Sequence, residues 1–155
     1  MNLSGPRWMP EEPAEAPAIR RAVILTSYGT GASRGNNLGV PGYSYDLVAR
    51  LFLKLLSRWG EVIQVARDAA RIEAAIQEAR QRGLQPIQFS FLPFQDVYLT
   101  PSAANVVMPF WEYPDVPNEA FDGNPQNNWT ATANRCDLVL VVGDFTAEAL
   151  RRAGV

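Results

Sequence analysis

Residues 22–28 read AVILTSY and run directly into Gly29. The stretch is short, apolar and rich in β-branched residues, which is typical of a strand buried on both faces of a parallel sheet. Comparable runs return later in the chain, as EVIQV at 61–65, PIQFSF at 86–91, ANVVMPF at 104–110 and DLVLVVG at 137–143. We predict a strand at each of these places, and DLVLVVG has the clearest pattern of a buried one.

Apolar residues at helical spacing separate the first three predicted strands. The stretch YSYDLVARLFLKLLSRWG at 43–60 carries leucine, valine, phenylalanine and tryptophan every three or four positions and stops at a glycine. Asp68 is placed to cap a second helix, which Gly83 would end. Both segments are predicted helices.

Two more helices are expected near the end of the chain. Asn124 and Pro125 suit the N-cap and first position of a helix that carries Trp129 and Cys136 on one face. Asp144 would cap the last helix, which Gly154 ends. Its inward residues would be Phe145, Ala149, Leu150 and Ala153.

Strands that alternate with helices predict an α/β fold, a doubly wound and mostly parallel sheet with helices on both faces. Residues 21–155 would form a single Rossmann-like domain. Residues 1–20 are rich in proline and glutamate without an apolar period, and are predicted to be a flexible leader. The pattern is weakest in that leader and in residues 92–103.

Composition limits the class of protein. The chain has 155 residues, 47% of them hydrophobic and 19% charged, as in soluble globular proteins. Its net charge of -2 argues against a nucleic-acid partner. No apolar run is long enough for a transmembrane segment, and the N-terminus lacks the hydrophobic core of a secretory signal. A cytoplasmic location, free or peripheral to the inner face of the membrane, is expected.

Histidine is absent and cysteine occurs once, at Cys136. The first fact removes histidine-based triads and histidine-ligated metal sites. The second excludes an internal disulfide and fits a reducing compartment. Because Cys136 falls on the apolar face of its predicted helix, we expect an inert core thiol. Neither a metal nor a cofactor is predicted.

A ligand site is expected where the strand order reverses, outside the carboxyl ends of the strands. With a strand order of 3-2-1-4-5, the reversal would lie between the first and fourth predicted strands. Two long coil stretches, Gly29–Gly42 and Trp111–Gly123, follow those two strands. Loops of this length are uncommon in compact domains unless they are functional. The sequence therefore predicts a cleft between them.

The first loop is glycine-rich and leads into a helix. Glycines let backbone N–H groups approach an anion, and the helix dipole favours negative charge there. The spacing matches neither a dinucleotide-binding fingerprint nor a P-loop. The alternative is that these glycines only make turns. The residues assigned to an anion contact are Gly29, Gly31, Asn37, Gly39 and Gly42.

The second loop places Trp111 and Tyr113, among prolines, beside Glu112 and Asp115. Aromatic faces with adjacent carboxylates suit a sugar or another polyol, although such rings also serve as cover for the end of a sheet. A carboxylate just past a buried strand is costly unless it is paired or functional. Glu112 is therefore the candidate catalytic residue, and no acid/base partner for it is evident.

Several stretches together resemble glycosyltransferases with the two-domain GT-B fold, of the retaining family-4 type. The resemblance covers residues 22–155. It is carried by NNLGVPGYSYDLVARLFLKLLSRWGEVIQV at 36–65, NVVMPFWEYPDVPNEAF at 105–121, NNW at 127–129 and CDLVLVVGDFTAEALRRAGV at 136–155.

The resemblance implies an acceptor-side, N-terminal domain whose nucleotide-sugar donor is held by a second domain with a Glu-x7-Glu motif. This chain has no glutamates eight positions apart, so it is expected to be the N-terminal half of a larger protein and inactive alone. Glu112 would be catalytic, the glycine loop would lie near the donor phosphates, and Trp111, Tyr113, Asp115 and Tyr43 would contact a sugar or glycan acceptor. The family's adjacent glycines are replaced here by Gly39-Val40-Pro41-Gly42.

Two other interpretations stay open. The chain would suit a non-catalytic, flavodoxin-like domain that binds a small ligand or regulates a partner. It would also suit an interaction module that uses exposed tryptophan and tyrosine surface, in which case a homodimer is expected.

Overall fold

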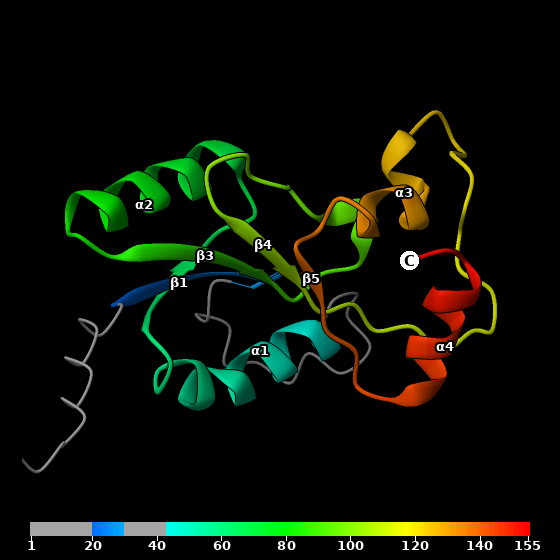
Figure 1. Ribbon diagram of the computed structural model, residues 1–155, viewed down its shortest axis with the longest axis horizontal. Helices are drawn as coiled ribbons and strands as arrows, with labels where there is room; N and C mark the ends of the chain where they lie inside the picture. The colour runs from blue at the N-terminus through cyan, green and yellow to red at the C-terminus, as the bar shows by residue number, and fades with distance from the viewer. Residues whose placement is uncertain (1–19, 30–42) are drawn as a thin grey trace, which may run out of the picture.

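Five parallel strands form a single sheet in the computed structural model, which describes residues 20–29 and 43–155 (Figure 1). Their order across the sheet is β2-β1-β3-β4-β5. The strands are β1 (Arg21–Thr26), β2 (Glu61–Val65), β3 (Gln85–Ser90), β4 (Ala104–Val107) and β5 (Leu138–Val139). The predicted α/β class is confirmed. The predicted leader lies outside the described residues except for Arg20.

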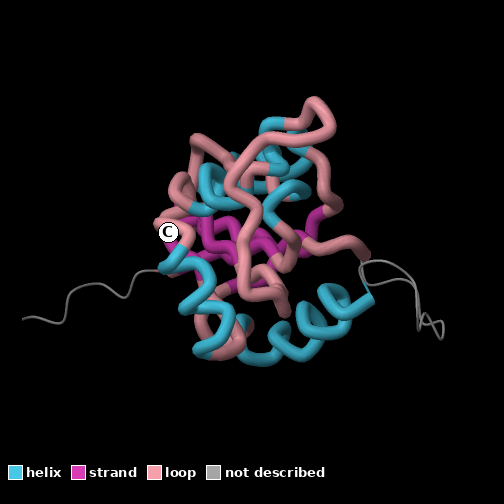
Figure 2. Tube along the Cα trace, turned by 90° about the vertical axis from the view of Figure 1, so that its right-hand side faces the viewer, coloured by secondary structure: helices cyan, strands magenta, loops and turns pink. Residues whose placement is uncertain are grey.

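Helices lie on both faces of the sheet, as the end-on view shows (Figure 2). Helix α1 (Tyr43–Leu56) covers one face, and α2 (Ala69–Gln81) covers the other. The remaining helical elements are the short 3-10 helices η1 (Phe94–Asp96) and η2 (Pro125–Asn127), and the helices α3 (Trp129–Ala133) and α4 (Asp144–Arg152). None of the helices described is long and apolar enough to cross a membrane.

The expected strand order of 3-2-1-4-5 is wrong. Strand β3 pairs with β1, not with β2, from Arg21↔Gln85 to Thr26↔Ser90. Strand β2 lies at the edge of the sheet, where its polar residues Glu61 and Gln64 are exposed to solvent. Strand β1, whose apolar run is buried on both faces, lies between β2 and β3. The switch in strand order consequently falls between β1 and β3.

Alternate side chains of β1 feed two separate cores, because successive residues of a strand point to opposite faces. Val23 and Leu25 pack on the α1 side, with Phe89 and Phe91 from β3 and the residue after it. Ala22 and Ile24 pack on the α2 side. There they meet the buried face of α2, which comprises Ile72, Ala75, Ile76 and Ala79.

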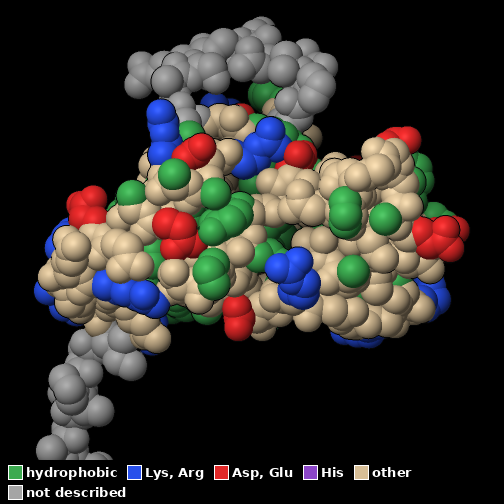
Figure 3. All heavy atoms as spheres, turned by 90° about the horizontal axis from the view of Figure 1, so that it is seen from above, with side chains coloured by type: hydrophobic (Ala, Val, Ile, Leu, Met, Phe, Trp, Pro, Cys, Tyr) green, Lys and Arg blue, Asp and Glu red, His purple; other side chains and the backbone are tan. Residues whose placement is uncertain are grey.

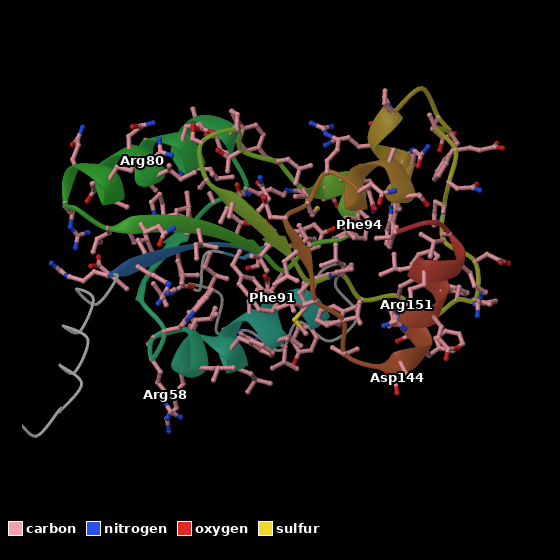
Figure 4. The ribbon with its side chains drawn as sticks, viewed as in Figure 1. Arg58, Arg80, Phe91, Phe94, Asp144 and Arg151 are labelled. Carbon is pink, nitrogen blue, oxygen red and sulfur yellow. The ribbon has the colours of Figure 1, made fainter. Side chains whose placement is uncertain are left out.

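A third core lies beside α2, where η1, α3 and α4 cover β4 and β5. Its centre is Phe94, which is fully buried and meets Trp129 edge-on with ring centroids 5.5 Å apart (Figure 4). Leu92 and Val97 are also buried, so the stretch 92–103, the weakest in the sequence pattern, contributes much of this core. Its apolar residues follow no regular period because the chain there is irregular apart from η1.

The predicted strand Asp137–Gly143 is much shorter than expected. Only Leu138–Val139 is a strand, and Leu138 is 49% exposed. The run is apolar on both faces, yet β5 is the edge strand of the sheet. Val139 and Val141 join the third core, while Leu138 and Leu140 point to the α1 side. The expectation of a buried strand is therefore wrong, since Val139 and Val141 are only partly buried.

Helix ends agree with the sequence at α2, at the start of α1 and at the end of α4, where Gly154 has a φ of 92°, and differ at the start of α4. Asp68 caps α2, where its Oδ1 accepts from Arg71 N at 2.9 Å, and Gly83 follows the helix with a φ of 70°. Asp144 was expected to cap α4, but Gly143 holds the N-cap position and Asp144 begins the helix. Phe145 was expected to point inward and is 55% exposed, because the third core is contacted by Thr146, Ala149 and Leu150.

The third predicted helix is divided in two. Asn124 and Pro125 open the short helix η2, and Asn128 then caps α3, where its Oδ1 accepts from Ala131 N at 2.9 Å. Cys136 lies beyond the end of α3 and is half-buried. Burial raises the pKa of its thiol to about 11, which favours the protonated form at neutral pH.

Candidate functional site

The switch between β1 and β3 brings together three chain segments at the carboxyl edge of the sheet. Tyr28 and Gly29 follow β1, Arg67 follows β2, and Asp96 closes η1 after β3. Because parallel strands end at the same edge, side chains distant in the sequence meet there. The structure therefore places a polar cluster where the fold favours a ligand.

We call Tyr28, Tyr45, Arg67 and Asp96 the edge cluster. Arg67 Nη1 lies 2.6 Å from Asp96 Oδ1, and the guanidinium carbon lies 5.0 Å from the centre of the Tyr28 ring. The Tyr28 hydroxyl donates to the other carboxylate oxygen, Asp96 Oδ2. Asp96 is thus held from two sides. The side chains of Arg67 and Asp96 remain 40% and 29% exposed, so both can reach a ligand.

Tyr45 joins the two predicted loops. Its hydroxyl accepts from Phe110 N at 3.1 Å and lies 3.3 Å from Phe110 O, to which it can donate. Its ring meets Tyr28 edge-on at 5.7 Å and packs on Phe110 at 4.6 Å. The segment after β1 and the segment after β4 therefore meet through one tyrosine of α1, although β3 separates their strands.

Gly29 is fixed by Asp46, in the first turn of α1. Gly29 N donates to Asp46 Oδ1 at 2.6 Å, and a Cβ at position 29 would lie 2.5 Å from Asp46 Oδ2. The position suits glycine because the carboxylate approaches the backbone closely. This hydrogen bond ties the start of the glycine loop to α1. The helix dipole also stabilises the Asp46 carboxylate, because it lies near the N-terminus of the helix.

Burial keeps both tyrosines of the cluster protonated. Desolvation raises the pKa of Tyr28 well above its usual value, and the neighbouring carboxylate of Asp96 raises it further. Desolvation also raises the pKa of Tyr45, from 10.0 to about 12. Both hydroxyls therefore keep their protons over the whole physiological range and can donate hydrogen bonds, as that of Tyr28 does to Asp96.

A loss of stability at alkaline pH is expected from Tyr45. The unfolded chain would release this proton near pH 10 and the folded chain only near pH 12, so stability falls as the pH rises through this interval. Tyr45→Phe should make the fall shallower. Urea denaturation of both proteins at about pH 9 and about pH 11 measures the difference. An identical pH dependence in the two proteins would contradict this assignment.

The predicted residues of the second loop separate into two groups. Trp111 is structural: its ring packs on Trp129 at 4.5 Å, its Nε1 donates to Asp115 O at 2.9 Å, and its carbonyl accepts from Thr146 Oγ1 at 2.8 Å. It anchors this loop to α3 and α4. This agrees with the alternative interpretation, in which the ring covers the end of the sheet. Tyr113 packs edge-on against Trp111 and is 64% exposed.

Glu112 and Asp115 are exposed. The sequence argument for Glu112 assumed a carboxylate buried at the end of a strand. Strand β4 ends at Val107, and the chain has reached the surface by Glu112, so no such desolvation cost arises. Among the described residues Glu112 has neither a hydrogen-bond partner nor an ion pair from its side chain. Tyr43 is the first residue of α1 and half-buried. Gly31, Asn37, Gly39 and Gly42 lie outside the described residues.

The edge cluster itself was not anticipated, apart from the neighbouring Gly29. Tyr28 was assigned to the end of the first strand, Arg67 received no role, and Asp96 lies in the stretch with the weakest pattern. The available signal was positional. Tyr28 and Arg67 each lie two residues past a strand, at the edge where ligands bind in doubly wound sheets, and Asp96 lies in the connection after β3.

No protein-family model, curated protein or solved structure gives a significant match to the chain. The site must therefore be interpreted from its own chemistry. Within residues 20–29 and 43–155, acidic and cysteine side chains form no cluster that could hold a metal ion. The edge cluster instead offers a guanidinium, a carboxylate, two phenol groups and aromatic ring faces, a set suited to binding hydroxyl groups and negative charge.

Proposed function

We propose that this chain is the acceptor-binding domain of a glycosyltransferase that uses a nucleotide-sugar donor. The observation that carries the proposal is the edge cluster at the switch between β1 and β3. The resemblance of residues 22–155 to retaining GT-B enzymes supports the same function. On this proposal the nucleotide-sugar is held by a second domain, and this chain alone does not transfer sugar.

The edge cluster supplies the groups that a sugar acceptor requires. Asp96 accepts hydrogen bonds from sugar hydroxyls, and its orientation is fixed by Arg67 and Tyr28. The N–H groups of the Arg67 guanidinium that do not contact Asp96 would bind a phosphate or carboxylate on the acceptor. Tyr28 is 36% exposed and offers a ring face to the sugar C–H groups. Glu112 stays the predicted catalytic carboxylate, and its exposure leaves it accessible to a ligand.

Calorimetric titration with a hexose phosphate, the free hexose and UDP-glucose tests the proposal. The hexose phosphate should bind best, and Arg67→Met should weaken it about 10–100-fold, because a hydrogen bond to a charged group contributes about 1.5–3 kcal/mol. Arg71→Met is the matched control, since Arg71 is exposed at the start of α2. Equal effects of the two variants would remove the edge cluster from the proposal.

A second function is favoured by one observation. The order β2-β1-β3-β4-β5 is that of flavodoxin-like folds, which bind a phosphate-bearing ligand at the same switch point. A non-catalytic domain of this kind would bind a nucleotide or FMN tightly by itself. A further titration with FMN separates the two functions. Binding of UDP-glucose or FMN more tightly than the hexose phosphate would favour this function over the acceptor-side role.

A further inference from the structure

An apolar groove opens on the α1 side of the sheet, far from the edge cluster. It has a volume of about 480 Å³ and runs between the last turns of α1 and strands β4 and β5. Phe89 and Val106 are buried at its floor, and Leu55, Trp59 and Leu138 are exposed to about half their area at its rim. Its size lies within the roughly 300–1,000 Å³ range of small-molecule sites.

The groove exists because one helix covers this face. A helix with its side chains is about 10 Å wide and strands are spaced about 4.8 Å apart, so one helix covers about two strands. Helix α1 packs under β1 and β3 (Figure 1), and the buried residues Ala149 and Leu150 of α4 belong to the third core. Leu138 and Leu140 lie on the α1 side of the sheet beyond the part that α1 covers, and they line the groove.

Positive charge gathers at one end of the groove. A neighbouring hollow of about 250 Å³ shares Arg58 and Trp59 with the groove and is also lined by Arg20 and Arg21. The Arg21 guanidinium carbon lies 5.6 Å from the centre of the Trp59 ring. Figure 4 shows Arg58 at this end of α1. We call the three arginines the arginine end.

The acidic residue of this hollow is already paired. Glu61 lies there too, but its Oε1 accepts from Arg82 Nη1 at 2.7 Å. The arginine end therefore keeps a net positive charge. On the opposite face of the molecule, around α2, acidic and basic side chains are interspersed (Figure 3). The arginine end adjoins the apolar lining of the groove, because Arg58 and Trp59 line both hollows.

We propose that the groove and the arginine end together bind a free, single-chain amphiphilic anion. The hydrocarbon chain lies against Phe52, Leu55 and Leu140, and the carboxylate or phosphate head is bound by Arg58 with Arg20 and Arg21. Arginine binds such heads through parallel N–H donors. The arginine end lies where β1 and β2 begin, at the amino edge of the sheet, so this site is separate from the edge cluster and independent of the proposed function.

Calorimetric titration with tetradecanoate, below its micellar concentration, tests both halves of the site. Tetradecanol should bind at least about tenfold more weakly, because it lacks the charged head. Dodecanoate should also bind roughly tenfold more weakly, because two methylene groups fewer are removed from water. Binding of tetradecyltrimethylammonium as tightly as tetradecanoate would contradict the proposal.

Paired variants on α1 and the turn after it locate the site. Leu55→Gln and Arg58→Gln should weaken tetradecanoate binding about tenfold or more. Leu51→Gln and Arg50→Gln are the matched controls, because these residues are also exposed on α1 but do not line the groove. The controls should bind tetradecanoate like the unchanged protein. All four positions are exposed, so thermal unfolding should confirm that every variant is folded.

Two other occupants of this face give different results. If the face docks on a membrane, binding to phosphatidylglycerol vesicles exceeds binding of free tetradecanoate, and Leu51→Gln impairs it as much as Leu55→Gln. If the face joins a second copy of the chain, light scattering detects a dimer that both leucine variants dissociate. Either result would overturn the proposed amphiphile site.

Discussion

Phe94→Ala is expected to lower the free energy of unfolding by about 3–5 kcal/mol, the usual cost of removing a fully buried phenylalanine ring. Phe94 lies at the centre of the third core and contacts Trp129. The cavity would loosen η1, which also carries Asp96 of the edge cluster. Urea denaturation followed by circular dichroism measures the change in stability.

Phe145→Ala is the matched control for this experiment. It removes the same ring from α4, but Phe145 is 55% exposed and leaves no cavity. Its effect should stay within about 0.5 kcal/mol, as for most surface substitutions. If the two variants were equally stable, Phe94 would not be the centre of a cooperative core.

Asn105→Ala should cost about 2–4 kcal/mol, because it removes three hydrogen bonds to buried or half-buried backbone. Asn105 Oδ1 accepts from Thr100 N at 2.8 Å, and Nδ2 donates to Thr100 O at 2.9 Å and Ala103 O at 3.2 Å. Asn105 is only 7% exposed, so water cannot readily replace these bonds. Thermal and urea denaturation measure the loss.

Asn134→Ala is the control, since Asn134 is exposed and its side chain donates one hydrogen bond, to Gly154 O at 3.0 Å. A cost below about 1 kcal/mol is expected for it. Asn105→Asp should cost at least as much as Asn105→Ala at neutral pH, because it buries a carboxylate against the carbonyl oxygens of Thr100 and Ala103. A cost for Asn105→Ala no larger than that of Asn134→Ala would show that the turn from Thr100 to Asn105 is not held by this side chain.

The elements of the sheet could be predicted because local patterns define them. The apolar run of β1 and the capping of α2 by Asp68 are encoded within a few residues each. The strand order could not be predicted in the same way. Pairing of β3 with β1 rather than with β2 depends on which strand can lie at the edge of the sheet. The polar residues Glu61 and Gln64 indicate β2 only once the whole sheet is considered.

The sequence predicted where in the fold a ligand site lies, but not which residues form it. A polar site at the carboxyl edge follows from the fold class alone. Which side chains meet there depends on the strand order, and the reversal lies at β3 instead of β4. Asp96 was therefore missed. Trp111, an aromatic residue beside carboxylates, suits a ligand platform by sequence alone. Its structural role depends on contacts with Trp129 and Thr146, which only the tertiary structure shows.

The place of β1 in the sheet has a consequence for biosynthesis. Thr26 pairs with Ser90, which follows it in the chain by 64 residues. At a translation rate of about 5–20 residues per second, β3 leaves the ribosome about 3–13 s after β1. During that interval the most apolar strand of the nascent chain lacks one of its two neighbours, which makes it a natural segment for a chaperone to bind.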